Sequence, residues 1–220
     1  EFVVNPSDVV RDYGADTLRL YEMFMGPLEV SKPWSTTAVV GAKKFINRVW
    51  NFFTESKNIT DADDGKLTKI YHQTVKKVTN DFEALGFNTA IAQMMVFVNE
   101  VYKNGTCPRA YAEGFIKMLS CITPHVGEEI WQLLGHSDTI AYEAWPSYDE
   151  EKCRDSEITM AVQVNGKMRG TVVMDADLEN DQVIANVLAD EKIARFLEKQ
   201  GGSVVKTIVV RNKLVNLIVK

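Results

Sequence analysis

The sequence predicts a multi-domain protein: an all-α helix bundle followed by a small α+β domain with the element order ββααββ. Apolar residues recur every three to four positions in the first part of the chain, as in amphipathic helices. From residue 158 onward they alternate with polar residues, as in strands. This change of period, with a polar, proline-containing stretch between, predicts a helical domain over 1–145, a linker over 146–157 and a small domain over 158–220.

Six or seven helices with short connections are expected in the first domain. Asn5 can cap the first helix, Pro6 suits its first turn, and Gly14 ends it. Thr123 is expected to cap the last one. The expected helices cover about 6–13, 15–25, 36–55, 67–85, 88–103, 109–121 and 125–134. In the third, the inward face is expected to hold Val39, Ala42, Ile46, Val49, Trp50 and Phe53.

The small domain opens with a β-hairpin over 158–174, whose turn is Asn165-Gly166. A three-residue loop with Gly166 in the left-handed conformation is preferred over a two-residue loop, because the latter places Lys167 and Arg169 on the apolar face. The preferred register yields two faces. The apolar face holds Ile158, Met160, Val162, Met168 and Val172, and the polar face holds Gln163, Lys167, Arg169 and Thr171.

The rest of the small domain is expected to contain helix over 177–199, broken near Asp190, and strands over 204–210 and 214–219. Its charges are segregated: six acidic residues precede a run of basic residues that begins at Lys192. Two interpretations stay open, namely a positive surface that includes the hairpin lysine and arginine, and a solvated face that balances the acidic stretch.

Composition excludes few functions. The chain has 25 basic and 30 acidic residues, so its net charge of −5 does not indicate a nucleic-acid-binding protein, and local patches must carry that argument. Three widely spaced cysteines suit a reducing, cytoplasmic environment. Neither a signal peptide nor an apolar run long enough to span a bilayer is recognised, and a monomer without a membrane partner is expected.

No catalytic or metal site is expected. His72, His125 and His136 are isolated from one another, and Pro124 interrupts the helical spacing between Cys121 and His125. His72 shares a basic helix face with three lysines, which is either a solvated surface or a phosphate contact. The lysines of this face are Lys69, Lys76 and Lys77.

Four stretches resemble a known family. The run VVNPSDVVRDYGADTLRLYEMFMGPLEVSKPWS is similar to the segment after the KMSKS loop of bacterial leucyl-tRNA synthetases, and LSCITPHVGEEIWQLLG resembles the last bundle helix of class I synthetases for aliphatic amino acids. VQVNGKMRGTV and KTIVVRNKLVNLIV are similar to the C-terminal domain of the bacterial leucine enzyme. Two departures are noted. Glu1-Phe2 replaces a Gly-Asn pair and is expected to be foreign to the natural protein, and Arg211-Asn212 replaces a common Pro-Gly.

The resemblance implies an anticodon-binding-type helical domain and a domain that touches the outer corner of tRNA(Leu), with no DNA partner. The nucleotide-binding fold, the HIGH motif and the KMSKS loop would lie upstream. The chain alone is therefore expected to lack the site for ATP, Mg²⁺ and leucine, and to be inactive in aminoacylation. The residues expected to contact tRNA phosphates are Lys44, Arg48, Lys76, Lys167, Arg169, Lys206, Arg211 and Lys213.

Two alternatives are retained. The first is the same region of a valine, isoleucine or methionine enzyme, against which the VQVNGKMRG hairpin argues. The second is a helical protein-interaction module without a nucleic-acid role, which the acidic net charge supports.

Overall fold

The computed structural model describes residues 3–154 and 157–220. The chain divides into two compact units, Glu1–Cys153, called the helical unit, and Arg154–Lys220, called the small unit. The expected foreign pair Glu1-Phe2 lies outside the described residues. Helices and sheets are both present, and the mixed helical and sheet architecture expected from the change of period is confirmed.

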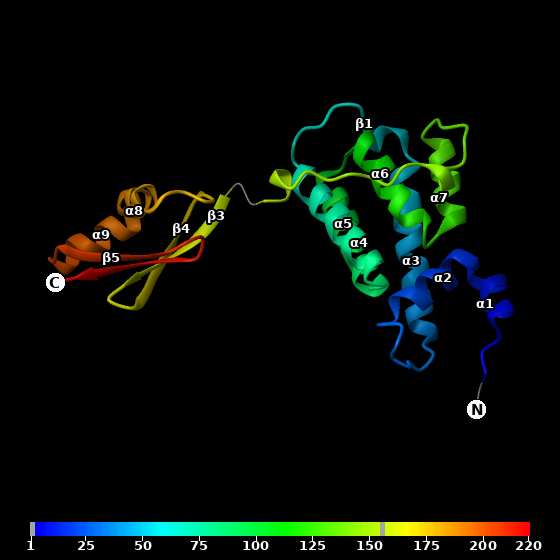
Figure 1. Cartoon of the computed structure of the whole chain (residues 1–220), viewed down its shortest axis with the longest axis horizontal. Coiled ribbons are helices and arrows are strands. Elements are labelled where there is room, and N and C mark those ends of the chain that lie inside the picture. The colour runs from blue at the N-terminus through cyan, green and yellow to red at the C-terminus, as the bar shows by residue number, and fades with distance from the viewer. Residues whose placement is uncertain (1–2, 155–156) are drawn as a thin grey trace. The chain divides into compact units, whose positions relative to one another are not determined.

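The helical unit is a bundle in which α4 and α5 pack side by side (Figure 1). A short parallel pair, β1 (Ile59–Thr60) and β2 (Cys107–Pro108), ties two of its loops together, and it was not expected because two residues show no period. Its helices are α1 (Pro6–Tyr13), α2 (Ala15–Phe24), α3 (Thr36–Phe53), α4 (Thr68–Glu83), α5 (Phe87–Asn104), α6 (Arg109–Ser120) and α7 (Pro124–Leu133).

Local sequence signals explain several helix ends. The Asn5 side chain accepts a hydrogen bond from the Ser7 N–H at 3.0 Å, with Pro6 in the first turn, so the expected cap of α1 is confirmed. The expected cap of α7 is wrong: the Thr123 hydroxyl donates to the Leu119 carbonyl and accepts no hydrogen bond from the first turn of α7. The carboxylate that caps α7 is that of Asp16, described below.

One apolar stripe of α3 faces the core of the bundle. Phe45 and Phe52 are buried, whereas Trp50 is 37% exposed, so the inward placement of Trp50 is wrong. The stripe is centred on the line through Ala42 and Val49, and Trp50 falls on its flank.

The segment after α7 returns along the bundle. Residues 145–153, called the strap, lie on α4, although the sequence placed most of them in the expected linker over 146–157. Four side chains of α4 hold the strap. Thr79 accepts from Trp145 Nε1 at 2.8 Å, His72 accepts from the Asp149 N–H at 3.0 Å, Lys76 pairs with Glu150, and Gln73 donates to the Cys153 carbonyl at 2.8 Å.

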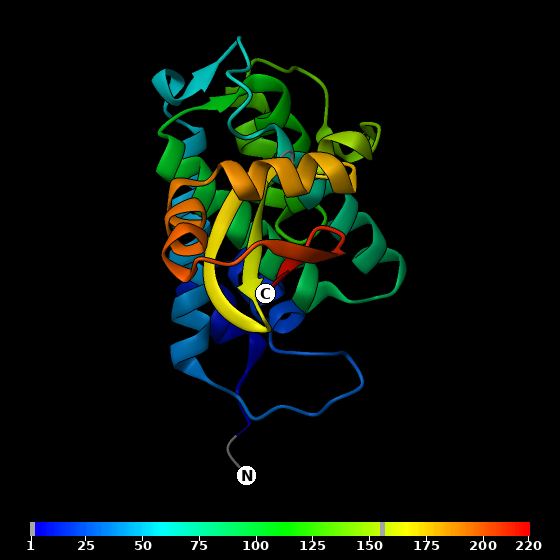
Figure 2. The same ribbon diagram turned by 90° about the vertical axis from the view of Figure 1, so that its left-hand side faces the viewer.

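The small unit is a four-stranded sheet with two helices on one face (Figures 1 and 2). The strand order is β4-β3-β6-β5, with β3 parallel to β6 and both outer pairs antiparallel. The elements are β3 (Glu157–Val164), β4 (Lys167–Asp175), α8 (Asn180–Ala189), α9 (Glu191–Gln200), β5 (Val204–Val210) and β6 (Leu214–Val219).

The first hairpin differs from the expected register. Val164 pairs with Lys167, so the loop has two residues, and both Asn165 (φ 48°) and Gly166 (φ 76°) are left-handed, as a type I′ turn requires. A β-bulge corrects the register one step later, because Arg169 has no partner across the ladder.

The bulge reverses the expected sides of two residues. Met168 pairs with Gln163 and is 55% exposed, so its placement on the apolar face is wrong. Lys167 pairs with the buried Val164, so the placement of Lys167 on the polar face is also wrong. Val172 is buried, as expected. One bulged residue therefore accommodates a two-residue turn and an apolar inner face together.

Candidate nucleic-acid interface

Two basic residues of α3 lie on the bundle surface at i and i+4. Lys44 is exposed and makes no ion pair with any described residue. Arg48 donates from Nη1 to Asn99 Oδ1 at 2.9 Å, and its guanidinium lies 4.8 Å from the ring centre of Tyr102 on α5. Arg48 is thus held in place, while Lys44 is free to move.

Lys76 is the basic residue on α4 that the sequence selected. Its ammonium group is 2.5 Å from Glu150 of the strap, and this hydrogen bond raises the pKa of Lys76. A phosphate can bind Lys76 only by displacing a carboxylate. The structure therefore gives Lys76 a role in holding the strap, which the sequence did not indicate.

Lys167 and Arg169 lie on β4, which is an edge of the small sheet. Lys167 follows the turn and is exposed. The bulge directs Arg169 toward α9, where its guanidinium lies 4.4 Å from the ring centre of Phe196. Stacking on an aromatic ring leaves the donor edge of a guanidinium open to a phosphate.

The remaining three residues belong to β5 and the turn before β6. Lys206 is exposed on β5, which is the other edge. Arg211 pairs with Asp177 at 3.2 Å, and Asn212 exchanges two further hydrogen bonds of 3.0 Å with Asp177. Lys213 is exposed and makes no ion pair within the described part of the chain.

These five groups of the small unit surround its sheet instead of forming one cluster. β3 and β6 are neighbours, as convergence requires, but they are parallel, so the turn at 165–166 and the turn at 211–213 lie at opposite ends. Lys167 and Lys206 are on opposite edges, three strand spacings apart, or about 14 Å. The cations thus lie along both edges and at both ends of the sheet, and Arg169 points toward the face that α9 covers.

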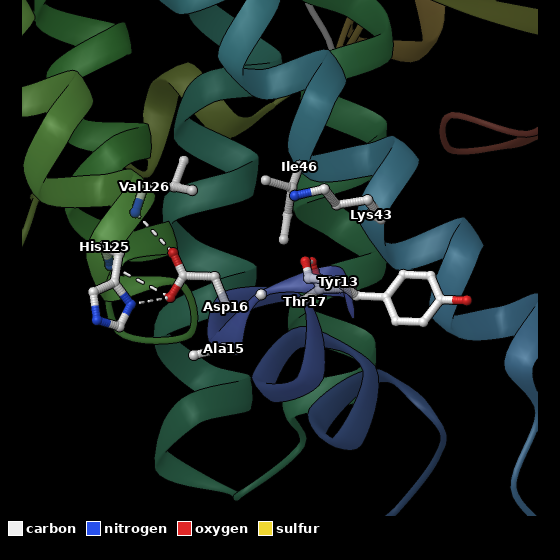
Figure 3. Close-up of a pocket in the computed structure, with 9 residues that line it drawn as sticks. Tyr13, Ala15, Asp16, Thr17, Lys43, Ile46, His125 and Val126 are labelled. Atoms are coloured by element: carbon white, nitrogen blue, oxygen red, sulfur yellow. Dashed lines mark hydrogen bonds and ion pairs between the residues drawn. The ribbon is translucent and has the colours of Figure 1, made fainter. Parts of the chain in front are cut away.

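A site that the sequence reasoning missed is the carboxylate of Asp16 on α2, whose side chain is 7% exposed. It accepts from the Val126 N–H at 2.7 Å, from the His125 N–H at 3.4 Å, and contacts His125 Nδ1 at 2.8 Å (Figure 3). An acidic group at a helix N-terminus satisfies free amides and complements the helix dipole. No local pattern reveals this contact, because Asp16 and Val126 are 110 residues apart.

Asp16 borders a hollow of about 340 Å³ that Tyr13, Lys43 and Ile46 also line (Figure 3). The carboxylate is engaged by the first turn of α7, so it holds two helices together and is a poor candidate for a proton acceptor. The residues that line the hollow include no second carboxylate, and the Thr17 hydroxyl donates to the Tyr13 carbonyl at 2.8 Å.

The thiols are suited to packing rather than to nucleophilic chemistry. Burial raises the pKa of the Cys107 thiol to about 12, and burial also raises the pKa of Cys121 and Cys153. A thiol with a raised pKa holds little of the reactive thiolate at neutral pH.

Among the described residues, no three His, Cys, Asp or Glu side chains are arranged to hold a metal ion. Within the same residues, no helix combines the length and apolar character needed to cross a bilayer.

The sequence and the fold were compared with those of known proteins. Residues 64–185 match the family described as the anticodon-binding domain of tRNA ligase. The fold is similar to that of an Agrobacterium radiobacter K84 leucyl-tRNA synthetase, agnB2, whose crystal structure is a ternary complex with tRNA and LeuAMS. The TM-score is 0.76 at 26% sequence identity, and the match covers 99% of this chain and 30% of that one.

The chain therefore spans about a third of the synthetase that it resembles. The family match extends from the loop before α4 into α8 and covers more than half of the 220 residues. The chain belongs to the family of anticodon-binding domains of tRNA ligases.

Proposed function

We propose that this chain is the tRNA-binding part of a bacterial-type leucyl-tRNA synthetase, and that it positions tRNA(Leu) for aminoacylation by other parts of the enzyme. The observation that carries the proposal is the structural match over 99% of the chain to a leucyl-tRNA synthetase whose crystal contains tRNA. The small unit strengthens it, because the match includes the ββααββ unit as well as the bundle.

The surface geometry supports phosphate contacts at defined positions. Lys44, Lys167, Lys206 and Lys213 are exposed and unpaired with the described carboxylates, so they can bind phosphate without first losing a partner. Arg48 and Arg169 are oriented by aromatic rings. Such contacts fix the position of a nucleic acid but carry no sequence information directly. Lys76 and Arg211 contribute only after exchange of their carboxylate partners.

The chemistry belongs elsewhere in the parent enzyme. We assign ATP, Mg²⁺ and leucine to upstream domains, and we expect the chain alone to bind tRNA without aminoacylating it. The Cys107 thiol is buried and the Asp16 carboxylate caps α7, which agrees with a positioning role. We assign the chain to the cytoplasm. We take the chain to be a monomer with tRNA as its partner.

Titration of the chain with tRNA(Leu) at low salt tests the proposal. Saturable binding is expected, with only a modest preference over tRNA(Val), because contacts to the backbone report shape and charge. A double-stranded RNA of equal charge serves as the comparison. The absence of tRNA binding would instead favour a helical protein-interaction module, consistent with the acidic charge of the whole chain. Equal binding of the duplex would show attraction to RNA charge alone and would contradict a role in positioning tRNA.

A further inference from the structure

A further cavity of the helical unit, called the apolar cavity, has a volume of about 460 Å³. Three segments form it: α2, the first residue of α5, and the turn between α6 and α7. Its apolar walls come from Leu18, Met23, Phe87 and Ile122. Small-molecule sites in proteins are cavities of about 300–1,000 Å³ with apolar walls and a few polar groups. The apolar cavity has the size and lining of such a site.

The walls of the apolar cavity are already in place before anything binds. Ile122 belongs to the core of the bundle, and Leu18, Met23 and Phe87 pack against that core. The ring of Phe87 also meets the ring of Phe82 edge-on, with 5.2 Å between the ring centres. A ligand that enters a pre-formed cavity loses little affinity to the ordering of side chains.

Two charged residues of α2, Arg19 and Glu22, also line the cavity. Opposite charges three residues apart on a helix usually pair, yet within the described part of the chain neither residue forms an ion pair. Arg19 instead donates from Nε to the Ile122 carbonyl at 2.8 Å and from Nη2 to the Cys121 carbonyl at 3.1 Å. These bonds hold the guanidinium on the turn between α6 and α7. Its Nη1 and the Glu22 carboxylate remain open to a ligand.

One fixed cation and one free anion beside an apolar cavity match a zwitterion with an apolar side chain. Its carboxylate can accept from Arg19, and its ammonium group can donate to Glu22. An apolar acid without an amino group would bring a second negative charge near Glu22. An apolar amine without a carboxylate would bring a second positive charge near Arg19. A free α-amino acid carries both groups on one carbon atom, next to its side chain.

We infer that the apolar cavity binds a free apolar α-amino acid, with the carboxylate on Arg19, the ammonium group on Glu22, and the side chain among Leu18, Met23 and Phe87. None of these residues is among those expected to contact tRNA, so the inference goes beyond the proposed function and does not depend on it.

The first test is a chemical-shift titration of the whole chain by NMR, with phenylalanine as the probe. We expect saturable binding with a dissociation constant of about 1 mM. The acid 3-phenylpropanoate lacks the ammonium group, and phenethylamine lacks the carboxylate. Each should bind about fivefold more weakly than phenylalanine, because one charge of the site stays unpaired. Glycine, which lacks the apolar side chain, should cause no saturable shift.

Cys121 lines the cavity and is exposed, so it reports on occupancy in the natural sequence. Alkylation with iodoacetamide, followed by mass spectrometry of the peptides, measures the reaction rate of each thiol. Saturating phenylalanine should slow alkylation of Cys121 and leave the rate at Cys153 of the strap unchanged. Protection of Cys121 that grows with protein concentration, without any ligand, would mean that a second copy of the chain covers the cavity, and would contradict the inference.

Glu22→Gln tests the charge match. The thermal midpoint should not change, because Glu22 has no ion pair to lose among the described residues. Phenylalanine should bind about fivefold more weakly to this variant, whereas 3-phenylpropanoate should bind at least as well as to the wild type, since the repelling carboxylate is gone. Glu129→Gln is the matched control, because Glu129 is exposed on α7 and does not line the cavity. The control should bind both ligands like the wild type.

Three further results would overturn the inference. They are the absence of saturable phenylalanine binding, affinities for phenylalanine and 3-phenylpropanoate within twofold of each other in the wild type, and phenylalanine binding that leaves the alkylation rate of Cys121 unchanged. None of these results bears on tRNA binding, so failure of this inference and failure of the proposed function are separate outcomes.

Discussion

The Nδ1 atom of His72 accepts a hydrogen bond from the backbone N–H of Asp149 at 3.0 Å, which fastens the strap to α4. Burial lowers the pKa of His72 below its ordinary value of 6.5, with Lys152 acting in the same direction and Asp149 and Asp63 opposing. This bond requires the neutral tautomer that carries its proton on Nε2, because Nδ1 then has a free lone pair. In the protonated ring both nitrogens are donors, so Nδ1 cannot accept.

The first prediction follows from that bond. Folded His72 binds a proton more weakly than unfolded His72, so its stabilising contribution is complete above pH 6.5 and declines as the pH falls below that value. Hydrogen exchange of the Asp149 amide, corrected for the intrinsic rate at each pH, should show that protection of this amide falls as the pH is lowered from 7.5 to 5.5. His72→Gln should remove this pH dependence, and His125→Gln, at an exposed histidine, should retain it. Equal pH dependence in all three proteins would contradict the assignment.

The second prediction concerns the carboxylate that caps α7. Asp16→Ala leaves two backbone N–H groups of the first turn without their acceptor, and we expect a loss of about 2–3 kcal/mol in the free energy of unfolding. Asp12→Ala removes an exposed carboxylate paired with Arg11 and should cost about 0.5 kcal/mol or less. Urea denaturation measures both. Similar losses for the two variants would show that Asp16 does not link α2 to α7.

The third prediction separates two neighbours on α3. Lys44→Gln should weaken binding of every tRNA by a similar factor and leave stability unchanged. Arg48→Gln should also weaken tRNA binding, and should in addition lower stability by about 1 kcal/mol, because the contacts with Asn99 and Tyr102 are lost. Lys57→Gln, at an exposed loop lysine, controls for the loss of one charge. Selective loss of leucine tRNA binding would mean that these residues contact bases.

The fourth prediction applies to the parent enzyme. Lys167→Ala/Arg169→Ala removes two cations from the β4 edge, and we expect aminoacylation to fall while leucine activation by ATP is retained. Phe196→Leu is the matched control, since it removes the ring beneath Arg169 and keeps both charges. Parallel loss of both activities would indicate a folding role for the hairpin.

Periodicity in the sequence was sufficient for the type and order of most elements, because 3.6 and 2 are distinct periods over ten or more residues. It was insufficient for the hairpin register. The pattern of apolar and polar residues does not show that Arg169 is the bulged residue. The faces on which Met168 and Lys167 lie depend on the position of this bulge.

The candidate site shows the same limit. The exposed positions of Lys44 and Lys206 follow from local pattern, whereas the pairing of Lys76 with Glu150 joins residues 74 positions apart. The Asp16 cap and the strap on α4 are also long-range contacts. Local sequence reasoning identified the cations but could not tell which of them already have partners.

The most direct test of the central claim is the salt dependence of tRNA binding by the whole chain. If Lys44, Arg48, Lys167, Lys206 and Lys213 contact phosphates, the logarithm of the association constant should fall linearly with the logarithm of salt concentration. Each neutralised lysine should then reduce the slope by about 0.7 to 0.9. Binding that is independent of salt, or a slope that none of these substitutions changes, would contradict the account.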